Sequence, residues 1–273
     1  MQAQSDRRGS VSWRVNAERI VLLGWGRAIL LQLAHPLIAA GVFDHSSFRA
    51  SPWSAVSRLR QTVQAMLRLT FGTEAEHART LEGIRAIHRR VNGHLPETVG
   101  PWPAGTRYSA EDPALVLWVH ATLIDSIVRA HELLVAPLSE ADRDAYCREA
   151  APVAVALLAR PEEVPQSWAG MRDYVDGMYA SGHLAIGPQA RELAEAVLAP
   201  TGTWPLAPAT WVNRIVTEGL LPPDLRSQYR MTWPPHRERQ FALLIRGLRG
   251  ARRALPDALA LWPEARRQPP GGL

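Results

Sequence analysis

Apolar side chains recur every three or four residues along most of this chain, and no segment shows a sustained alternation of apolar and polar residues. A spacing of three to four places side chains on one face of an α-helix, whereas a half-buried strand requires a period of two. The pattern therefore predicts an all-α fold, a single globular domain of many helices. Helices are expected near residues 17–34, 54–70, 74–95, 112–134, 139–158, 165–180, 187–199 and 208–220, followed by an arginine-rich last helix.

Local signals place several helix ends. A proline disfavours helical conformation in the residue before it, so His35-Pro36 marks the end of the first helix. Asp112-Pro113 combines an N-cap acid with proline at the first helical position. Ser139, with Asp142 three residues later, resembles a capping box. Loops rich in proline and tryptophan are expected at 96–108 and 199–211.

Three helices carry an apolar stripe that we expect to be buried, and histidines occupy central positions in two of them. The stripes are Val56, Leu59, Val63, Met66 and Leu69 or Thr70 in the first; His77, Leu81, Ile84, His88, Val91 and Leu95 in the second; and Val116, His120, Leu123, Ile127, Ala130 and Leu134 in the third.

The length of 273 residues and the 47% hydrophobic content suffice for one large core. We expect a flexible N-terminus over residues 1–12, a helical domain over 13–265 and a disordered tail over 266–273. No internal repeat is visible.

The chain contains no lysine, because all 31 of its Lys and Arg residues are arginine, and it has one cysteine, Cys147. The missing amine excludes a Schiff-base enzyme and a Walker-type phosphate loop. A single cysteine excludes an intramolecular disulfide, a multi-cysteine zinc site and an iron–sulfur cluster built within one chain.

Positive charge is concentrated at the C-terminal end. Residues 1–236 hold 23 Arg and 23 Asp and Glu, whereas residues 237–273 hold 8 Arg and 3 acids. Such an end can contact nucleic acid or an anionic membrane, but a solvated face on a last helix is the favoured interpretation. Nucleic acid is not expected as a partner. The inner side of that helix is predicted to hold Phe241, Leu244, Ile245 and Leu248.

No transmembrane segment is expected. The apolar run from Ala28 to Phe43 is 16 residues long and contains Gln32, His35 and Pro36, whereas a spanning helix takes about 20 apolar residues. Arg7-Arg8 resembles a twin-arginine signal, but the charged residues that follow interrupt the apolar region such a signal needs. A cytoplasmic location is therefore predicted.

Several familiar motifs are weak here. Gly24-Trp25-Gly26 follows no strand, so a phosphate-binding loop is disfavoured. Glu74-x-x-His77 is the only Glu-x-x-His pair, whereas a di-iron bundle requires two. His131-Glu132 lacks the second histidine of a zinc protease motif, and no Gly-x-Ser-x-Gly elbow indicates a hydrolase.

The remaining candidates are His35, His88 and His120 on apolar faces. A core histidine bonded to a neighbouring carbonyl or carboxylate is the commoner case. The functional alternative is an imidazole that ligates haem between helices, which requires one axial nitrogen, an apolar slot and cations for the propionates.

The order of several motifs resembles bacterial relatives of the MpaB oxygenase and the rubber oxygenase catalytic domain, with the resemblance running over about residues 12–265. The motifs are Leu33-Ala34-His35-Pro36, Gly41-x-x-Asp44-His45-Ser46, Arg58-x-x-x-Thr62, Phe71-Gly72-Thr73, Ile87-His88-x-x-Val91-x-Gly93, Tyr108-x-Ala110-x-Asp112-Pro113 and Trp118-Val119-His120-Ala121-Thr122-Leu123.

This resemblance implies an all-helical domain with a haem pocket between helices that holds haem b (iron). It implies His88 as the proximal iron ligand, with Arg58 and Thr62 on the distal side. Because i and i+4 share a helix face, these two side chains can point into one pocket. The rubber-cleaving enzymes can carry a lysine just before that threonine, whereas this sequence has Gln61. Rubber cleavage is therefore not carried over.

Other residues complete the expected site. Asp44 and His45 lie where a distal acid or base is expected, and Arg58, His35 and His120 are further candidates for contact with the cofactor. Of these, His120 is favoured as a supporting or core residue. The leading hypothesis is a haem-dependent oxygenase that acts with O₂ on a small apolar substrate, unsaturated or isoprenoid-like. A non-catalytic helical protein that binds haem or an apolar ligand is the alternative.

A third hypothesis is an arginine-tailed helical regulator. It requires a short helix-turn-helix with a basic recognition helix near the N-terminus. Residues 20–45 are instead apolar with one arginine, so this hypothesis is disfavoured.

Overall fold

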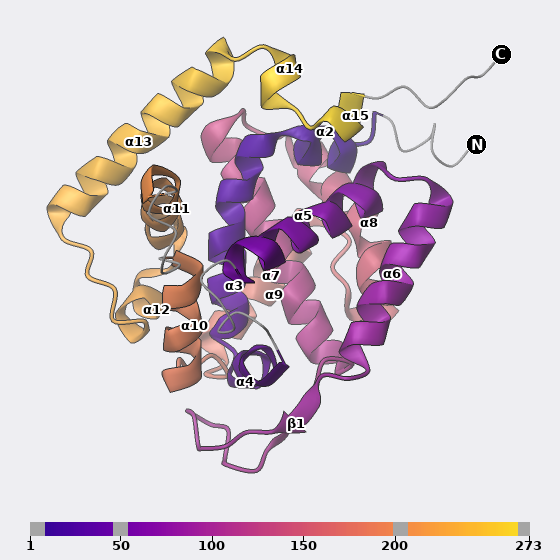
Figure 1. The fold of residues 1–273 in the computed structure, drawn as a ribbon, viewed down its shortest axis with the longest axis vertical. Helices are drawn as coiled ribbons and strands as arrows, with labels where there is room; N and C mark the ends of the chain where they lie inside the picture. Colours follow the sequence, from indigo (N-terminus) through magenta and orange to yellow (C-terminus); the bar gives the residue numbers. More distant parts are fainter. Residues whose placement is uncertain (1–8, 46–53, 199–206, 267–273) are drawn as a thin grey trace.

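The computed structural model describes residues 9–45, 54–198 and 207–266, without the side chains of residues 54–56 and 58. Within these ranges the chain forms helices and one two-stranded sheet (Figure 1). The elements are α2 (Val11–Ala17), η1 (Arg19–Gly24), α3 (Trp25–Leu33), α4 (Pro36–His45), α5 (Ser54–Phe71), α6 (Glu74–His88), β1 (Asn92–His94), β2 (Arg107–Ser109), α7 (Pro113–Leu134), α8 (Glu140–Ala156), η3 (Pro161–Glu163), α9 (Trp168–Ala180), α10 (Pro188–Leu198), α11 (Ala207–Leu220), α12 (Pro223–Gln228), α13 (Pro235–Ala254), α14 (Asp257–Ala260) and α15 (Pro263–Arg266). The predicted all-α class and single domain are confirmed.

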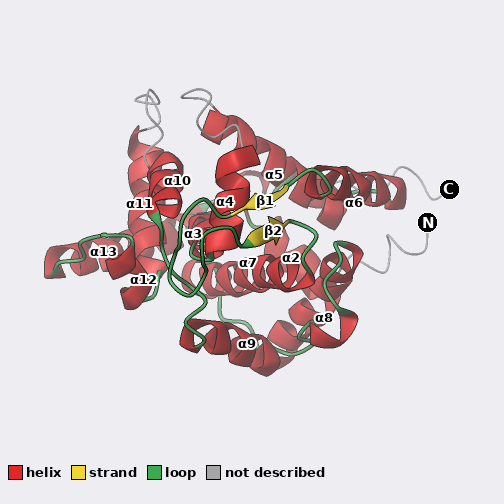
Figure 2. Ribbon diagram, turned by 90° about the horizontal axis from the view of Figure 1, so that it is seen from below, coloured by secondary structure: helices red, strands yellow, loops and turns green. Residues whose placement is uncertain are grey.

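Helix α7 is the centre of the fold. It packs against η1, α3, α8, α9 and α13, and Figure 2 shows it surrounded by other helices. By length and composition α7 could cross a membrane, but 72% of its most apolar window is buried inside the fold. The bent pair Arg19–Leu33 and Pro36–His45 passes the same test, with a bend of 106°. Burial identifies α7 as the core helix of the domain.

Three predicted helix ends are confirmed. The side chain of Asp112 accepts a hydrogen bond of 2.9 Å from the amide of Ala114, which caps α7. Ser139 accepts one of 3.1 Å from the amide of Asp142, which caps α8. The chain also breaks at His35, between α3 and α4. Local sequence determines these ends because a cap uses groups within a few residues of one another.

The predicted single helix over 17–34 is wrong in its first half. Glu18 is extended, with φ −75° and ψ 112°, and pairs with Leu261 across an isolated bridge. A 3₁₀ segment then leads to Gly24, where an added Cβ would lie 2.6 Å from the carbonyl oxygen of Ser126. Contacts with distant segments therefore interrupt the helix. The glycine permits close packing of η1 on α7, and Gly24-Trp25-Gly26 is a packing motif.

The predicted stripe over 74–95 is also wrong as one helical face. Helix α6 ends at His88 and contains no buried residue, whereas Val91 and Leu95 pack in a cluster around Tyr108. The reason is an antiparallel pairing of β1 with β2, in register Gly93 with Tyr108. The loop predicted at 96–108 accordingly ends in a strand.

In α5, Val63 and Met66 pack against the core as predicted, but Leu59 is 46% exposed. The buried face continues instead through Leu67 and Phe71, which pack with Trp13. Leu59 therefore does not reach the core, and the side chain of Val56 lies outside the described part of the chain.

The arginine-rich helix α13 runs along one edge of the molecule (Figure 1). Its predicted inner side is confirmed, because Phe241, Leu244, Ile245 and Leu248 pack in one cluster. Arg252 also donates to both carboxylate oxygens of Glu18, at 2.5 and 2.6 Å. The tail from residue 267 lies outside the described residues, as do residues 1–8 of the predicted flexible N-terminus.

Candidate functional site

His88 is the last residue of α6. A capping box formed by Thr73 and Glu76 starts this helix, so its first residue follows from local sequence. The imidazole is half-buried, and burial lowers its pKa, opposed by the negative charge of Glu111. The ring is therefore neutral at pH 7 and keeps a nitrogen lone pair, which an axial iron ligand requires.

His35 lies near the same end of α7 as His88. Burial, followed by the charge of His183, lowers the pKa of His35 to about 4, opposed by Asp112, the residue next to Glu111. Its ring packs on Trp102 at 4.9 Å between centroids, and its Nδ1 atom has no hydrogen-bond partner within residues 9–45, 54–198 and 207–266. The structure therefore places His35 and His88 near the start of α7, with His35 sealed in the core.

His120 lies two turns into α7 and is 8% exposed. Burial lowers its pKa to about 4, and its buried Nε2 atom has no hydrogen-bond partner in the part of the chain that the structure describes. Its sequence neighbours Thr122 and Asp125 bond elsewhere: the Thr122 hydroxyl donates to backbone carbonyls, and Asp125 pairs with arginines. A buried imidazole nitrogen with no protein partner is costly, which makes this atom a candidate to face a ligand.

Arg58 and Thr62 both belong to α5, which confirms that they lie one turn apart on one helix. Thr62 is exposed, and the side chain of Arg58 lies outside the described residues. Gln61, which precedes Thr62, is exposed and donates to the Ser57 hydroxyl at 3.4 Å. The distal roles of Arg58 and Thr62 therefore stay predictions.

Asp44 and His45, at the end of α4, are held by one tyrosine. The hydroxyl of Tyr108 donates to Oδ2 of Asp44 at 2.5 Å and lies 3.4 Å from Nε2 of His45. The same His45 nitrogen lies 3.1 Å from the carbonyl oxygen of Asn92. Burial, and then the hydrogen bond to Asp44, raise the pKa of Tyr108. The hydroxyl therefore stays protonated and serves as a fixed donor.

One motif glycine makes room for this tyrosine. A Cβ added to Gly93 would lie 2.5 Å from the hydroxyl of Tyr108, whereas one added to Gly41 would lie 3.6 Å from its ring, in ordinary van der Waals contact. Three sequence motifs thus converge on Tyr108, which sequence reasoning had placed in a motif but not in the site. The sequence feature that could have pointed to Tyr108 was its position in the same motif as Asp112-Pro113.

A buried ionic network was missed by sequence reasoning. Arg27 pairs with Asp125 at 2.6 Å and donates to the hydroxyl of Ser126 at 2.7 Å, while Arg129 contacts both oxygens of Asp125. Arg27 and Asp125 are both fully enclosed. Such residues are almost never buried unless paired, and the pairing involves residues about 100 positions apart, so no local pattern announces it.

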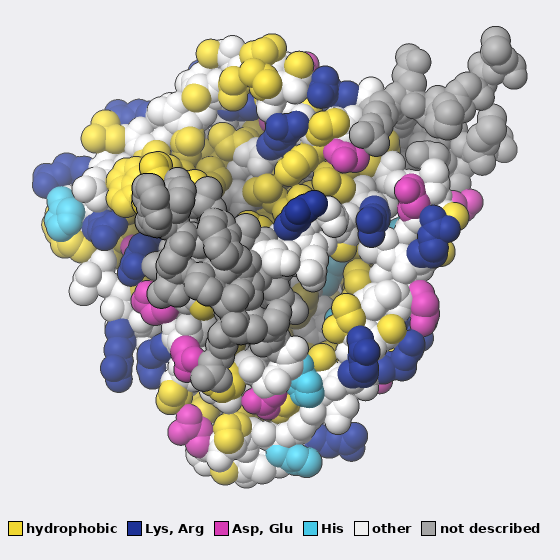
Figure 3. Space-filling model, viewed as in Figure 1, with side chains coloured by type: hydrophobic (Ala, Val, Ile, Leu, Met, Phe, Trp, Pro, Cys, Tyr) yellow, Lys and Arg dark blue, Asp and Glu magenta, His cyan; other side chains and the backbone are white. Residues whose placement is uncertain are grey.

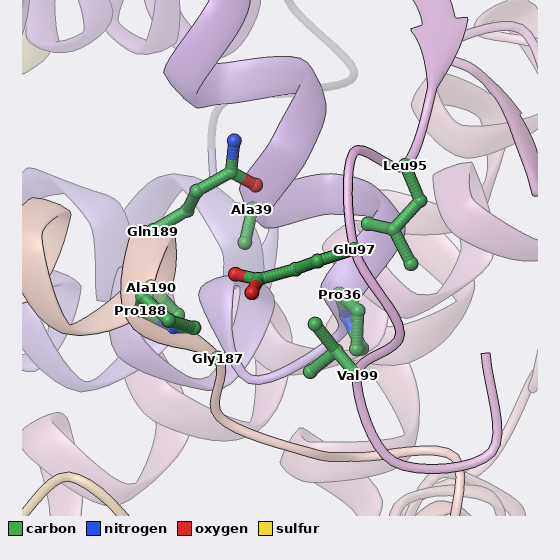
Figure 4. Close-up of a pocket in the computed structure, with 9 residues that line it drawn as sticks. All are labelled: Pro36, Ala39, Leu95, Glu97, Val99, Gly187, Pro188, Gln189 and Ala190. Carbon is green, nitrogen blue, oxygen red and sulfur yellow. The ribbon is translucent and has the colours of Figure 1, made fainter. Parts of the chain in front are cut away.

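Two cavities show how much space the described part of the fold offers to a ligand. A small, partly open one beside α4 and α10, into which the carboxylate of Glu97 points (Figure 4), has a volume of about 10 Å³, enough for roughly one water molecule. An open groove of about 470 Å³ between α7, α11 and α13 is lined by Arg129, Glu132, Leu133, Gly219, Leu220 and Phe241. Figure 3 also shows a hollow beside α5 and α6, with histidine atoms visible inside.

Within the described residues, no group of three or more His, Cys, Asp or Glu side chains could hold a metal ion. A haem iron can be held by a single protein ligand, so His88 requires no such group. The chemistry available around α6 is therefore one neutral imidazole from His88, with the Tyr108 hydroxyl and the Asp44 carboxylate on the neighbouring hairpin and α4.

Comparison with known proteins places the chain. A family profile described as "ER-bound oxygenase mpaB/B'/Rubber oxygenase, catalytic domain" matches residues 13–250. "Uncharacterized protein Mb2261" of Mycobacterium bovis and "Uncharacterized protein Rv2237" of Mycobacterium tuberculosis are each 28% identical over 234 residues, covering 84% of this chain and 87% of the relative. No solved structure matches the chain significantly. Because the profile spans most of the chain, including every motif that meets at Tyr108, the chain belongs to the MpaB/rubber oxygenase catalytic domain family.

Proposed function

We propose that this chain is a haem b-dependent oxygenase that acts with O₂ on a small apolar substrate, unsaturated or isoprenoid-like. The family is that of an oxygenase catalytic domain, which supports oxygenase activity in general. The observation that carries the haem assignment is His88, a half-buried imidazole that burial keeps neutral at the end of α6. A cytoplasmic location stays part of this proposal.

The residues present fit such a cofactor. His88 offers one neutral nitrogen, and His120, on α7, offers a buried Nε2 that has no hydrogen-bond partner among the described residues. The absence of lysine leaves arginines as the cations for two propionates. His88 would hold the iron, while His35 and His120 would belong to the surrounding wall.

When bound, the haem would supply the one-electron chemistry with dioxygen that side chains lack. The side chains of this chain would orient the reacting groups and supply protons to them. Arg58 stays charged at every working pH and can donate hydrogen bonds to an anionic oxygen, and Thr62 can orient a water on the same side. Asp44 or His45 would exchange a proton with the reacting group, and the hydroxyl of Tyr108, which contacts both, would hold them in place.

An absorption spectrum of protein expressed with added haem tests the cofactor. We expect a Soret band in the parent chain, its loss or shift in His88→Ala, and an unchanged band in His94→Ala, which removes an exposed histidine from β1. A parent chain without the band would overturn the haem proposal. An unchanged band in His88→Ala would overturn the ligand assignment alone.

Oxygen uptake with a panel of unsaturated lipids and polyisoprenes tests catalysis. We expect uptake with at least one apolar alkene, reduced about 10²-fold or more when Arg58→Leu removes a donor to developing negative charge. A haem-loaded chain that consumes no oxygen with any substrate of the panel would favour the non-catalytic binding protein.

A further inference from the structure

We propose that the outer face of α13 binds the surface of an anionic lipid membrane. This face lies opposite the inner side that packs on the core. It consists of Arg239, Ala242, Leu243, Arg246, Gly247, Gly250, Arg253 and Ala254. All of these residues are exposed, so in the described part of the chain no element covers the face.

The charged side chains on this outer face of α13 are all positive. Arg239, Arg246 and Arg253 recur every seven residues, which spaces them about 10 Å apart along a single stripe. The only carboxylate of α13, Glu238, lies off this stripe and accepts a hydrogen bond of 2.6 Å from the indole of Trp233. Arg252, by contrast, points to Glu18 and fastens the helix to the body. Within the described residues no carboxylate pairs with these three arginines, so the stripe presents cations that complement an anionic partner.

Exposed leucines accompany these arginines. Leu243 is 62% exposed on the stripe, and Leu255 and Leu259, just beyond the end of α13, are 42% and 58% exposed. A lipid interface accommodates both kinds of side chain, since leucine enters the acyl boundary while the arginine heads stay among the phosphates. A nucleic-acid backbone offers phosphates but little apolar surface for these leucines.

The glycines of the stripe have no packing role within the fold. A Cβ added to Gly247 or Gly250 would meet nothing within 4 Å, although glycine inside a helix costs about 1 kcal/mol relative to alanine. Small residues let the helix backbone lie close to an external surface. A second copy of the chain is disfavoured as that surface, because a two-fold pairing of this face would bring arginines against arginines.

Vesicle co-sedimentation of the full chain tests the proposal. We expect binding to phosphatidylcholine vesicles that contain about 30% phosphatidylglycerol, because anionic headgroups attract arginine side chains. Binding to vesicles of pure phosphatidylcholine should be weak. Binding should fall steeply at high salt. The triple variant Arg239→Gln/Arg246→Gln/Arg253→Gln should lower the partition coefficient roughly a hundredfold, about fivefold per arginine.

A matched triple variant controls for net charge. Arg79→Gln/Arg107→Gln/Arg148→Gln removes the same charge from exposed positions elsewhere and should leave binding within a few fold of the parent. Leu243→Ser should weaken binding severalfold at any salt concentration, whereas Val155→Ser, at an exposed position on α8, should not. Circular dichroism checks that each variant is folded.

Three results would overturn the proposal. The first is equal loss of vesicle binding in the two triple variants, or no vesicle binding by the parent chain. The second is tighter, salt-sensitive binding to duplex DNA than to anionic vesicles, which would assign the face to nucleic acid. The third is a dimer in sedimentation that the stripe variant dissociates, which would assign the face to a second copy.

Discussion

The surroundings of α7 and the layer formed by α5 and α6 use the same residue types in opposite ways. Around α7, Arg27, Asp125 and His120 are enclosed and their charges are paired or suppressed. In α5 and α6 no described residue other than Leu67 and Phe71 is buried, and His88 and Thr62 keep contact with solvent. The difference shows that depth, and not residue type, separates structural from chemically available groups. A ligand can reach His88, whereas Arg27 serves the fold.

The largest expected effect comes from breaking the enclosed ion pair. Asp125→Ala leaves the guanidinium of Arg27 buried without its carboxylate, and removing one partner of such a pair costs about 3–5 kcal/mol. Urea unfolding followed by circular dichroism measures this loss. The control is Glu163→Ala, which breaks the exposed pair with Arg160. This variant should change the free energy of unfolding by less than about 1 kcal/mol.

The double variant Arg27→Met/Asp125→Leu sharpens the comparison. Replacing both charges by apolar groups removes the uncompensated ion, so much of the stability lost in Asp125→Ala should return. A double variant no more stable than Asp125→Ala would show that the cost arises from packing and not from the unpaired charge.

A smaller loss of folding stability is expected when the pH is lowered. Because burial lowers the pKa of His35 and His120 from 6.5 to about 4, the unfolded chain binds more protons between these values. Stability therefore falls as the pH falls through this window, by about 2 kcal/mol per histidine between pH 7 and pH 5. Urea unfolding at both pH values measures the loss, and His120→Gln should reduce it by about half. An unchanged pH dependence in His120→Gln would contradict the sealed position of this ring.

The smallest effect is expected at the hairpin, where the partners of Tyr108 reach solvent. Tyr108→Phe removes the hydrogen bond to Asp44, and since Asp44 is exposed its carboxylate can bind water instead. We expect a loss of about 1 kcal/mol. Combining this change with Asp44→Ala in a double-mutant cycle tests the contact, because the two effects should be less than additive. Strict additivity would mean that the pair does not interact in solution.

Local sequence was sufficient wherever a feature involves neighbours along the chain. The cap at Asp112-Pro113, the break at His35-Pro36 and the inner side of α13 were all predicted, because caps, proline sterics and helical periodicity act over a few residues. The family resemblance also rested on short motifs whose order can be read directly. His88 was placed on a helix in this way, although that helix ends with it.

Tertiary structure alone decided which side chains meet. The convergence of Asp44, Gly93 and Tyr108 depends on pairing β1 with β2 and on seating α4 beside them, and the pairing of Arg27 with Asp125 depends on packing α3 against α7. The sequence by itself determined an all-α chain of a recognisable family with a candidate haem ligand and an arginine-rich end. Burial, which lowers the pKa of His35, His88 and His120 and determines the face that α13 leaves open, is a sum over contacts between distant segments, and only the folded chain contains those contacts.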